Sequence, residues 1–548
     1  MNPESISSAL DQLAGCVQKS QMARNHTHWG QHVTKFPGAL SRGPTAEELA
    51  HHVRLFLEVD RELQSHPDQL SPAQARLWRV IAAFFELHRA PALRDAMVKA
   101  LRIMEAAFPH PVPPSRSGLV QRSRRWSCWR KVHNETTRKN AWTAVIGSDS
   151  RFREPFCELV TRRNELARQL GHANFFDYRL RCDGWSPARW SDLLDHIERE
   201  TAGPYQRARD FVDAHLTRLW KRSFSPDACW QYGDPWVQTA PESLPGHPSR
   251  WIHGAPDVLA RLTLSGLGWA GRLYQLHVQR RHTWFPTAFC IHMNRGADVR
   301  IGANIGRDMQ SLQLMLHEAG HAAWFTQLDP ALPFLLRTPA HPLLSEGFSM
   351  LMQQLPFLPS WVRASRPGGR LRGILRHERD IRRADWIDRV FFVRWSLALI
   401  HFERQLYVGD DPDHQALYWR MVHRYQSFTM PAGREGCVDY LSKHHLVTHP
   451  ASYHHYLFGM CFASQLTRRL ARLQGHDTDP LDLDLTGRSS MLGLPTADSL
   501  AAGEYLRSNL FAPGADLDDP FVLAEQVCEA PFSAAALLED LSRLESMA

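Results

Sequence analysis

The stretch DMQSLQLMLHEAGHAAWFTQL, residues 308–328, contains the pattern His317-Glu318-Ala319-Gly320-His321. On a helix, side chains four residues apart lie one turn apart on the same face. His317 and His321 can therefore hold one zinc ion together. Glu318 is then placed beside the metal, where it can take a proton from bound water. The pattern predicts a zinc-binding helix.

The residues around this pattern favour a helix. Asp308 or Ser311 can cap its N-terminus, and leucines and a methionine between residues 312 and 316 supply an apolar face. Asp329-Pro330 is expected to end it, because proline cannot continue a helix.

A third ligand is needed, because with 30 histidines in the chain an accidental HExxH is expected about 0.1 times. Zinc hydrolases usually take this ligand from a following helix. Glu346, 25 residues after His321, is acidic within the otherwise uncharged run 343–351. An unpaired carboxylate there would be costly to bury, and metal ligation removes that cost. His341 is a competing ligand, but the following Pro342 indicates a loop, so Glu346 is the predicted third ligand.

Most of the chain shows helical periodicity. One apolar stripe with spacings of three or four consists of Phe391, Trp395, Ala398, Phe402 and Leu406. Arg389, Arg394 and Glu403 are expected elsewhere around the same helix. Similar helical patterns occupy about 46–106, 155–181 and 188–222. The sequence predicts a mainly α-helical protein.

One region favours a small β-sheet. Residues 284–292, WFPTAFCIH, are the best strand candidate, and they continue toward 298–301 across a turn at 294–296.

Composition limits the class of protein. With 548 residues, 43% of them hydrophobic and 22% charged, the chain is globular, and a formal charge of +7 is modest for its size. The nine cysteines are scattered and never form a CxxC pair, which favours a reducing compartment. The N-terminus shows no signal-peptide pattern, and no stretch is apolar enough to span a bilayer. We expect a soluble cytoplasmic protein without membrane partners.

A basic cluster at 122–131 contains Trp126 and Trp129, which could indicate nucleic-acid binding. We favour a solvated helix face with buried tryptophans, because nothing else in the chain repeats the pattern. No nucleic-acid partner is expected.

Several motifs resemble the angiotensin-converting-enzyme (peptidyl-dipeptidase A) family and the related thimet-type oligopeptidases. They are Asp298-Val299-Arg300-Ile301, the HEAGH that begins seventeen residues after Arg300, and Glu346. Residues 159–171, LVTRRNELARQLG, are similar to the family helix with an RNExAxxxG core. Segments 443–456 and 503–514 are similar to its substrate-binding segment and its C-terminal region. Recognisable motifs run from about 155 to 545.

The resemblance implies a two-lobed helical zincin (gluzincin) with a deep central cleft. It implies a single domain over 1–548, with a helical lid portion at 1–150 and a catalytic portion at 151–548. The zinc site would lie at 317–346 and the substrate-binding segment at 443–456.

The resemblance also assigns roles to residues. His317, His321 and Glu346 would bind Zn2+ and Glu318 would act as general base, as their chemistry independently suggests. By similarity to the family, the residues that stabilise the oxyanion are His445 and Tyr456, and those that bind the substrate's C-terminal carboxylate are Lys443 and Tyr453. Tyr453 and Tyr456 are expected on one face of a helix that starts near Pro450. The strand segment aligned with an extended substrate is Thr287, Ala288 and Cys290. His444, His449, His454 and His455 are expected to be ordinary histidines.

Three positions depart from the family pattern. Thr287 stands in place of a substrate-contacting histidine, and Met350 in place of an aspartate that supports a ligand histidine, so that support must come from elsewhere. His455 stands in place of an arginine involved in chloride activation. We therefore expect no chloride dependence.

These observations predict a zinc metallopeptidase of the peptidyl-dipeptidase type, acting on short peptides with a free C-terminal carboxylate. The departures at Thr287 and His455 keep two alternatives open. One is an oligoendopeptidase, and the other is an amide hydrolase acting on a peptide-like metabolite. A non-catalytic binding protein on the same fold is a further alternative.

Overall fold

In a computed structural model, the described residues are 1–30, 33, 43–107, 134–147, 150–247, 255–271, 276–279, 288–296, 298–306, 308–358, 361, 377–409, 411–474, 497–517 and 519–548. The basic cluster at 122–131 and Thr287 lie outside these ranges.

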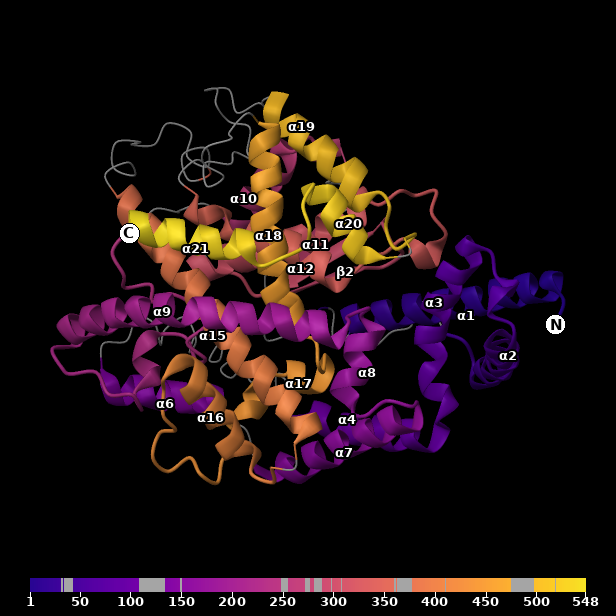
Figure 1. The fold of residues 1–548 in the computed structure, drawn as a ribbon, viewed down its shortest axis with the longest axis horizontal. Coiled ribbons are helices and arrows are strands. Elements are labelled where there is room, and N and C mark those ends of the chain that lie inside the picture. Colours follow the sequence, from indigo (N-terminus) through magenta and orange to yellow (C-terminus); the bar gives the residue numbers. More distant parts are fainter. Residues whose placement is uncertain are drawn as a thin grey trace.

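The described chain is mainly helical, as predicted (Figure 1). The first helices are α1 (Pro3–Trp29), α2 (Ala46–Ser65), α3 (Pro72–Phe85), α4 (Pro91–Ala107), α6 (Glu135–Ile146), α7 (Arg153–Gln169), α8 (Phe175–Cys182), α9 (Pro187–Trp220) and α10 (Pro256–Gly266). They are followed by α11 (Met309–Gln327), α12 (Pro342–Gln354), α15 (Glu378–Val408), α16 (His414–Gln426), α17 (His445–Thr448), α18 (His454–Leu473), α19 (Ala497–Leu506), α20 (Pro520–Cys528) and α21 (Ala535–Met547). None of the described helices combines the length and the apolar character that a membrane crossing requires.

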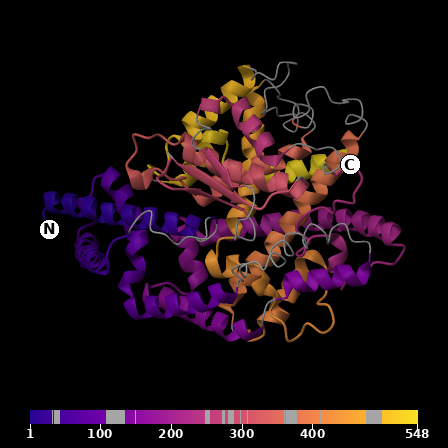
Figure 2. The ribbon, with the colours of Figure 1, turned by 180° about the vertical axis from the view of Figure 1, so that it is seen from behind.

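A small sheet accompanies the helices (Figure 2). Its strands are β1 (Leu276–Gln279), β2 (Ala288–His292) and β3 (Val299–Ala303), in the order β1-β3-β2. The predicted hairpin is confirmed, because β2 and β3 pair antiparallel with Cys290 opposite Ile301. The parallel strand β1 was not predicted, since four residues are too few to show an alternating pattern.

Strand β2 is an edge strand, and its register fixes which backbone groups point outward. The N–H of Met293 donates to the carbonyl of Asp298, and hydrogen-bonded pairs alternate along an antiparallel ladder. The backbone groups of Cys290 therefore face away from β3. At the end of the strand, the carbonyl of His292 accepts a 2.6 Å hydrogen bond from Asn25 on α1. The N-terminal helix α1 thus lies against this edge.

Helices α11, α12 and α18 pack side by side, and two glycines permit their close approach. A Cβ at Gly320 on α11 would lie 2.6 Å from Cα of Ser349 on α12. A Cβ at Gly347 on α12 would lie 2.9 Å from the carbonyl oxygen of Gly459 on α18. In Figure 1, α18 runs from the region of α17 past α12. The three helices therefore bring the HEAGH segment, Glu346 and the residues after Tyr453 into one region.

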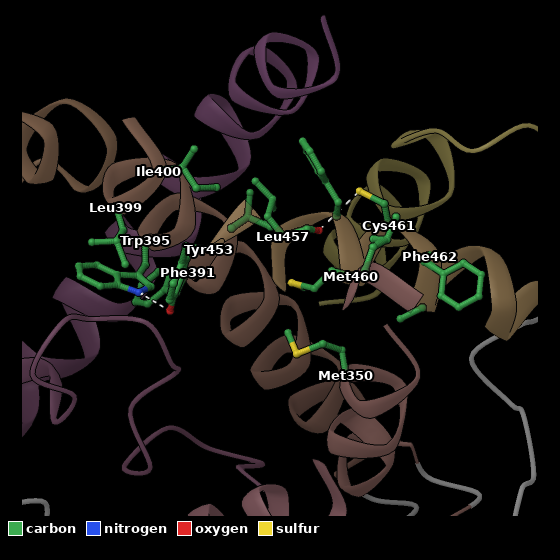
Figure 3. Packing of buried hydrophobic residues seen from close by; sticks show 14 of the residues in the cluster. Met350, Phe391, Trp395, Leu399, Ile400, Tyr453, Leu457, Met460, Cys461 and Phe462 are labelled. Carbon is green, nitrogen blue, oxygen red and sulfur yellow. Dashed lines mark hydrogen bonds between the residues drawn. The ribbon is translucent and has the colours of Figure 1, made fainter. Parts of the chain in front are cut away.

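Helix α15 lies in the core and is buried around its whole circumference. The predicted apolar stripe is confirmed, with Trp395 and Phe402 inaccessible to solvent. Figure 3 shows Phe391 and Trp395 of this stripe in the core. The charged residues predicted elsewhere on the helix are also buried, and each has a partner. Arg389 donates to Asp385 at 2.7 Å, Arg394 to the carbonyl of Tyr425 at 2.9 Å, and Glu403 accepts from the N–H of Ala451 at 2.7 Å.

Candidate metal centre

The structure brings His317, His321 and Glu346 together. The Nε2 atoms of the two histidines are 3.2 Å apart, and Oε2 of Glu346 lies 3.3 Å from Nε2 of His317 and 3.7 Å from Nε2 of His321. Zinc with bond lengths of about 2.0–2.1 Å in a tetrahedral site separates its ligand atoms by about 3.3 Å. The three side chains are 12%, 18% and 16% exposed, so the group is accessible from one side. We name His317, His321 and Glu346 the His317 cluster.

The donor set fits a zinc ion. Oε2 of Glu346 is buried and has no hydrogen-bond partner, so a cation is the natural group to satisfy it. Burial alone would lower the pKa of His317, but the carboxylate of Glu346 outweighs burial and raises it. Burial lowers the pKa of His321 to about 4, which keeps this ring neutral as a metal ligand must be. Two imidazoles and one carboxylate are a ligand set that zinc hydrolases use.

The local sequence explains why the two histidines are aligned. Asp308 caps α11 by accepting from the N–H of Ser311 at 2.8 Å, which is one of the two predicted caps. The helix ends at Gln327, two residues before the predicted stop at Asp329-Pro330. Its intact turns hold His317 and His321 on one face.

Ser345 supports one of these ligands. Nδ1 of His321 is hydrogen-bonded to the hydroxyl of Ser345 at 2.9 Å, which leaves Nε2 directed at the metal position. Support was expected from elsewhere than Met350, and Met350 lies among apolar side chains (Figure 3). His341, the competing ligand, is occupied as the cap of α12, where its Nδ1 accepts from the N–H of Leu343 at 3.0 Å.

Glu318 lies between the His317 cluster and strand β2. Burial raises its pKa to about 7, and the nearby Glu346 adds to this, whereas His317 and the backbone N–H of Cys290 oppose it. A carboxyl group with a pKa near neutrality can both accept and release a proton at physiological pH. The arrangement suits a general base.

Tyr456 and His445 form a second pair of polar groups at the same place. The phenol oxygen of Tyr456 lies 3.5 Å from Nε2 of His445. Burial raises the pKa of Tyr456 well above its ordinary value, and Glu346 and Glu318 add to the shift. The phenol therefore stays protonated. Burial lowers the pKa of His445 well below its ordinary value, so this ring is neutral.

Helix α18 does not start where predicted. Helix α18 begins at His454 rather than near Pro450, so Tyr453 precedes the helix and Tyr456 lies in its first turn. The reason is Ala451, whose φ of 55° is left-handed and incompatible with a continuing helix. The rings of Tyr453 and Tyr456 are nevertheless 5.1 Å apart.

Lys443 occupies a buried box of aromatic rings. Its Nζ lies 4.0 Å from the ring centre of Trp236, 5.2 Å from that of Trp395 and 5.6 Å from that of Tyr453. Nζ also donates to the side-chain oxygen of Gln238 at 3.1 Å. Burial lowers the pKa of Lys443 to about 8. We name the polar residues Lys443, Gln238 and Tyr453 the Lys443 box. The rings of Trp236 and Trp395 line it.

Two contacts fix the Lys443 box in place. The indole N–H of Trp395 donates to the hydroxyl of Tyr453 at 2.9 Å (Figure 3). The carboxylate of Asp234 accepts from the backbone N–H of Gln238 at 3.1 Å. An amide, a phenol and an ammonium group are therefore held together in one buried group.

Arg163, within the RNExAxxxG segment, anchors the segment 443–456. Its guanidinium donates to the carbonyls of Leu446 at 2.8 Å and Val447 at 2.6 Å. These carbonyls directly follow Lys443-His444-His445 in the chain. The segment that carries Lys443 and His445 is thus fastened to α7.

Sequence reasoning missed Gln238, Trp236, Trp395, Ser345 and Arg163 as parts of this region. Only Ser345, adjacent to Glu346, offered a local signal. Ala288 and Cys290 lie on β2, and Thr287 is outside the described residues.

Comparisons of the chain with protein-family models and with curated proteins find no match.

Proposed function

We propose that this protein is a zinc-dependent metallopeptidase that releases dipeptides from the C-terminus of short peptides. The observation that carries the proposal is the convergence of the His317 cluster, the buried Glu318 and Tyr456. Tyr456 is close enough to Glu346 and Glu318 for both to affect its pKa. The proposed architecture is a two-lobed zincin with a central cleft, in which the N-terminal helices act as a lid.

Each residue of the site has its own role in the proposed hydrolysis. Zinc, held by His317, His321 and Glu346, would supply a Lewis acid for the scissile carbonyl and the attacking water. Glu318 accepts the proton of that water and returns it to the leaving amine. Tyr456 and His445 donate hydrogen bonds to the developing oxyanion, each contributing about 2 to 4 kcal/mol if well aligned.

Two further features support a peptide substrate. The backbone carbonyl of Cys290 on the edge strand β2 faces outward, where an extended peptide can pair with it, while the N–H of Cys290 is engaged by Glu318. The Lys443 box offers a cation, an amide and a phenol for a terminal carboxylate. The ring of Tyr453 lies 5.1 Å from that of Tyr456 and 5.4 Å from that of His445, so the box lies next to the proposed oxyanion donors. This proximity favours cleavage at a fixed short distance from the C-terminus.

The test compares N-blocked tripeptides that bear a free or an amidated C-terminus, using zinc-loaded protein. Dipeptide release from the free acid alone supports the proposal. Equal cleavage of both substrates would replace it with the oligoendopeptidase alternative. No cleavage of either by protein with bound zinc would leave the amide hydrolase of a peptide-like metabolite, or a non-catalytic binding protein.

A further inference from the structure

A second group of metal-binding side chains lies where α8 meets α18. Asp183 is the residue that ends α8, and His454 and His455 are the first two residues of α18. One ligand atom from each of the three side chains lies within 4.8 Å of the other two. We name these residues the His454 cluster.

The geometry of this cluster matches that of the His317 cluster. Nε2 of His455 lies 3.2 Å from Oδ2 of Asp183, compared with 3.3 Å between His317 and Glu346. These two atoms form an ion pair when His455 is protonated, and neither makes a well-aligned hydrogen bond. The same separation is also the one expected of two ligands on a shared metal ion.

Several buried polar atoms of the cluster make no hydrogen bond. Oδ2 of Asp183, Nε2 of His455 and both ring nitrogens of His454 are buried without a hydrogen bond. His454 is only 1% exposed and is surrounded by the rings of Trp185, Trp190 and Phe458. Buried polar groups in native proteins are nearly always satisfied. One cation would satisfy an atom of each residue at once.

Arg179 orients the carboxylate of Asp183 toward the two histidines, and the nearby His341 makes its hydrogen bonds elsewhere. Arg179 donates to Oδ1 of Asp183 at 3.3 Å, which leaves Oδ2 directed at the histidines. His341 uses both nitrogens elsewhere, because its Nε2 donates to the carbonyl of Asp183 at 2.8 Å and its Nδ1 accepts from Leu343.

We propose that Asp183, His454 and His455 bind a second divalent transition-metal ion, zinc foremost. Two imidazoles and one carboxylate suit zinc, iron or cobalt rather than calcium or magnesium. The ion joins the end of α8 to the start of α18, one residue before Tyr456. Its role is to fix that turn rather than to meet substrate.

The test is the metal content of the full-length protein after zinc loading and desalting, measured by inductively coupled plasma mass spectrometry. The wild type is expected to hold two zinc ions per chain. Asp183→Asn, which preserves the side-chain volume, and His454→Asn should each reduce this to one, as should His317→Ala. His341→Gln is the matched control, since His341 borders the cluster without an available nitrogen, and it should retain two ions.

One zinc ion in the wild type, lost in His317→Ala, would overturn the second site and leave the proposed function intact. Two ions in Asp183→Asn and His454→Asn would also overturn it. If either variant fails to fold, as shown by circular dichroism, the wild-type stoichiometry decides the question alone. Loss of one ion in these variants but none in His317→Ala would contradict the proposed function and support the second site.

Discussion

The His317 cluster and the His454 cluster use the same chemistry in different surroundings. Both combine two histidines and one carboxylate with a nearest N–O distance of 3.2 to 3.3 Å. The side chains of the first are 12% to 18% exposed and lie beside Glu318 and Tyr456. In the second, Asp183 and His455 are 10% and 5% exposed, and aromatic rings surround His454.

The difference in solvent exposure distinguishes a catalytic from a structural use of the same ligand set. Catalytic zinc sites keep a position open for water or substrate, whereas structural sites are closed by the protein. In our proposals Glu318 is the base at the His317 cluster, whereas the carboxylate of the His454 cluster, Asp183, is itself a ligand. We therefore propose that the His317 cluster is catalytic and that the His454 cluster stabilises the start of α18.

The largest effect is expected from Glu318→Gln. The amide cannot accept a proton, so kcat for an N-blocked tripeptide should fall about 10³-fold. Zinc content should stay unchanged, because Glu318 is not a ligand. The matched variant Glu346→Gln should lose zinc from the His317 cluster instead. Substantial activity in Glu318→Gln would contradict its role as base.

Tyr456→Phe is expected to have the next largest effect. Removal of one oxyanion donor should lower kcat about 10²-fold, with little change in KM. Tyr453→Phe is the matched control and should act mainly on KM, because Tyr453 belongs to the Lys443 box. Steady-state kinetics of both variants separate these roles, and equal changes in KM alone would refute the assignment of Tyr456.

Lys443→Met tests the Lys443 box. Loss of the ammonium should lower kcat/KM for a free-acid tripeptide about 30-fold, in the range expected for a lost charge-assisted hydrogen bond. Cleavage of an amidated analogue, already slow, should not decrease further. A similar decrease for both substrates would show that the lysine acts through packing rather than through the carboxylate.

Ser345→Ala should weaken zinc binding at the His317 cluster without affecting the His454 cluster. Loss of the hydrogen bond that orients His321 is expected to raise the zinc dissociation constant about 10-fold. Competition with a chromophoric chelator measures this constant. Ser349, one turn further along α12, offers a matched control variant, Ser349→Ala, since its hydroxyl has no hydrogen bond to a ligand. Equal affinities in both variants would argue against a supporting role for Ser345.

The pH dependence gives the smallest effect. Burial lowers the pKa of Lys443 to about 8, so its ammonium is charged below pH 8 and loses its charge above it. In the free enzyme, kcat/KM for the free-acid substrate should therefore decrease about fourfold between pH 7 and pH 8.5. Lys443→Met should lack this limb in its pH profile. A wild-type profile that stays flat to pH 9.5 would contradict a charged Lys443 in substrate binding.

Sequence reasoning predicted the parts of the site that local patterns encode. His317, His321 and Glu318 follow from the helical period, and Glu346 from its isolation in an apolar run. The structure brings the two histidines and Glu346 to within metal-binding distance of one another. The β2–β3 hairpin was likewise visible from its alternation and turn residues.

The remainder depends on contacts between segments far apart in the chain. Gln238 meets Lys443 across 205 residues, and Arg163 meets Leu446 across 283. No periodicity signals such pairs. His454 and His455 were expected to be ordinary, because Asp183, the carboxylate beside them, follows a helix far away in the sequence. The start of α18 was placed too early, because the left-handed Ala451 is not a glycine.

The central claim is tested most directly by removing and restoring metal while following hydrolysis of an N-blocked tripeptide with a free C-terminus. The account predicts that chelation abolishes dipeptide release and that the first equivalent of returned zinc restores it in the wild type. Glu318→Gln should take up the same zinc without regaining activity. Dipeptide release that persists in metal-free protein, or that Glu318→Gln regains in full, would contradict the account.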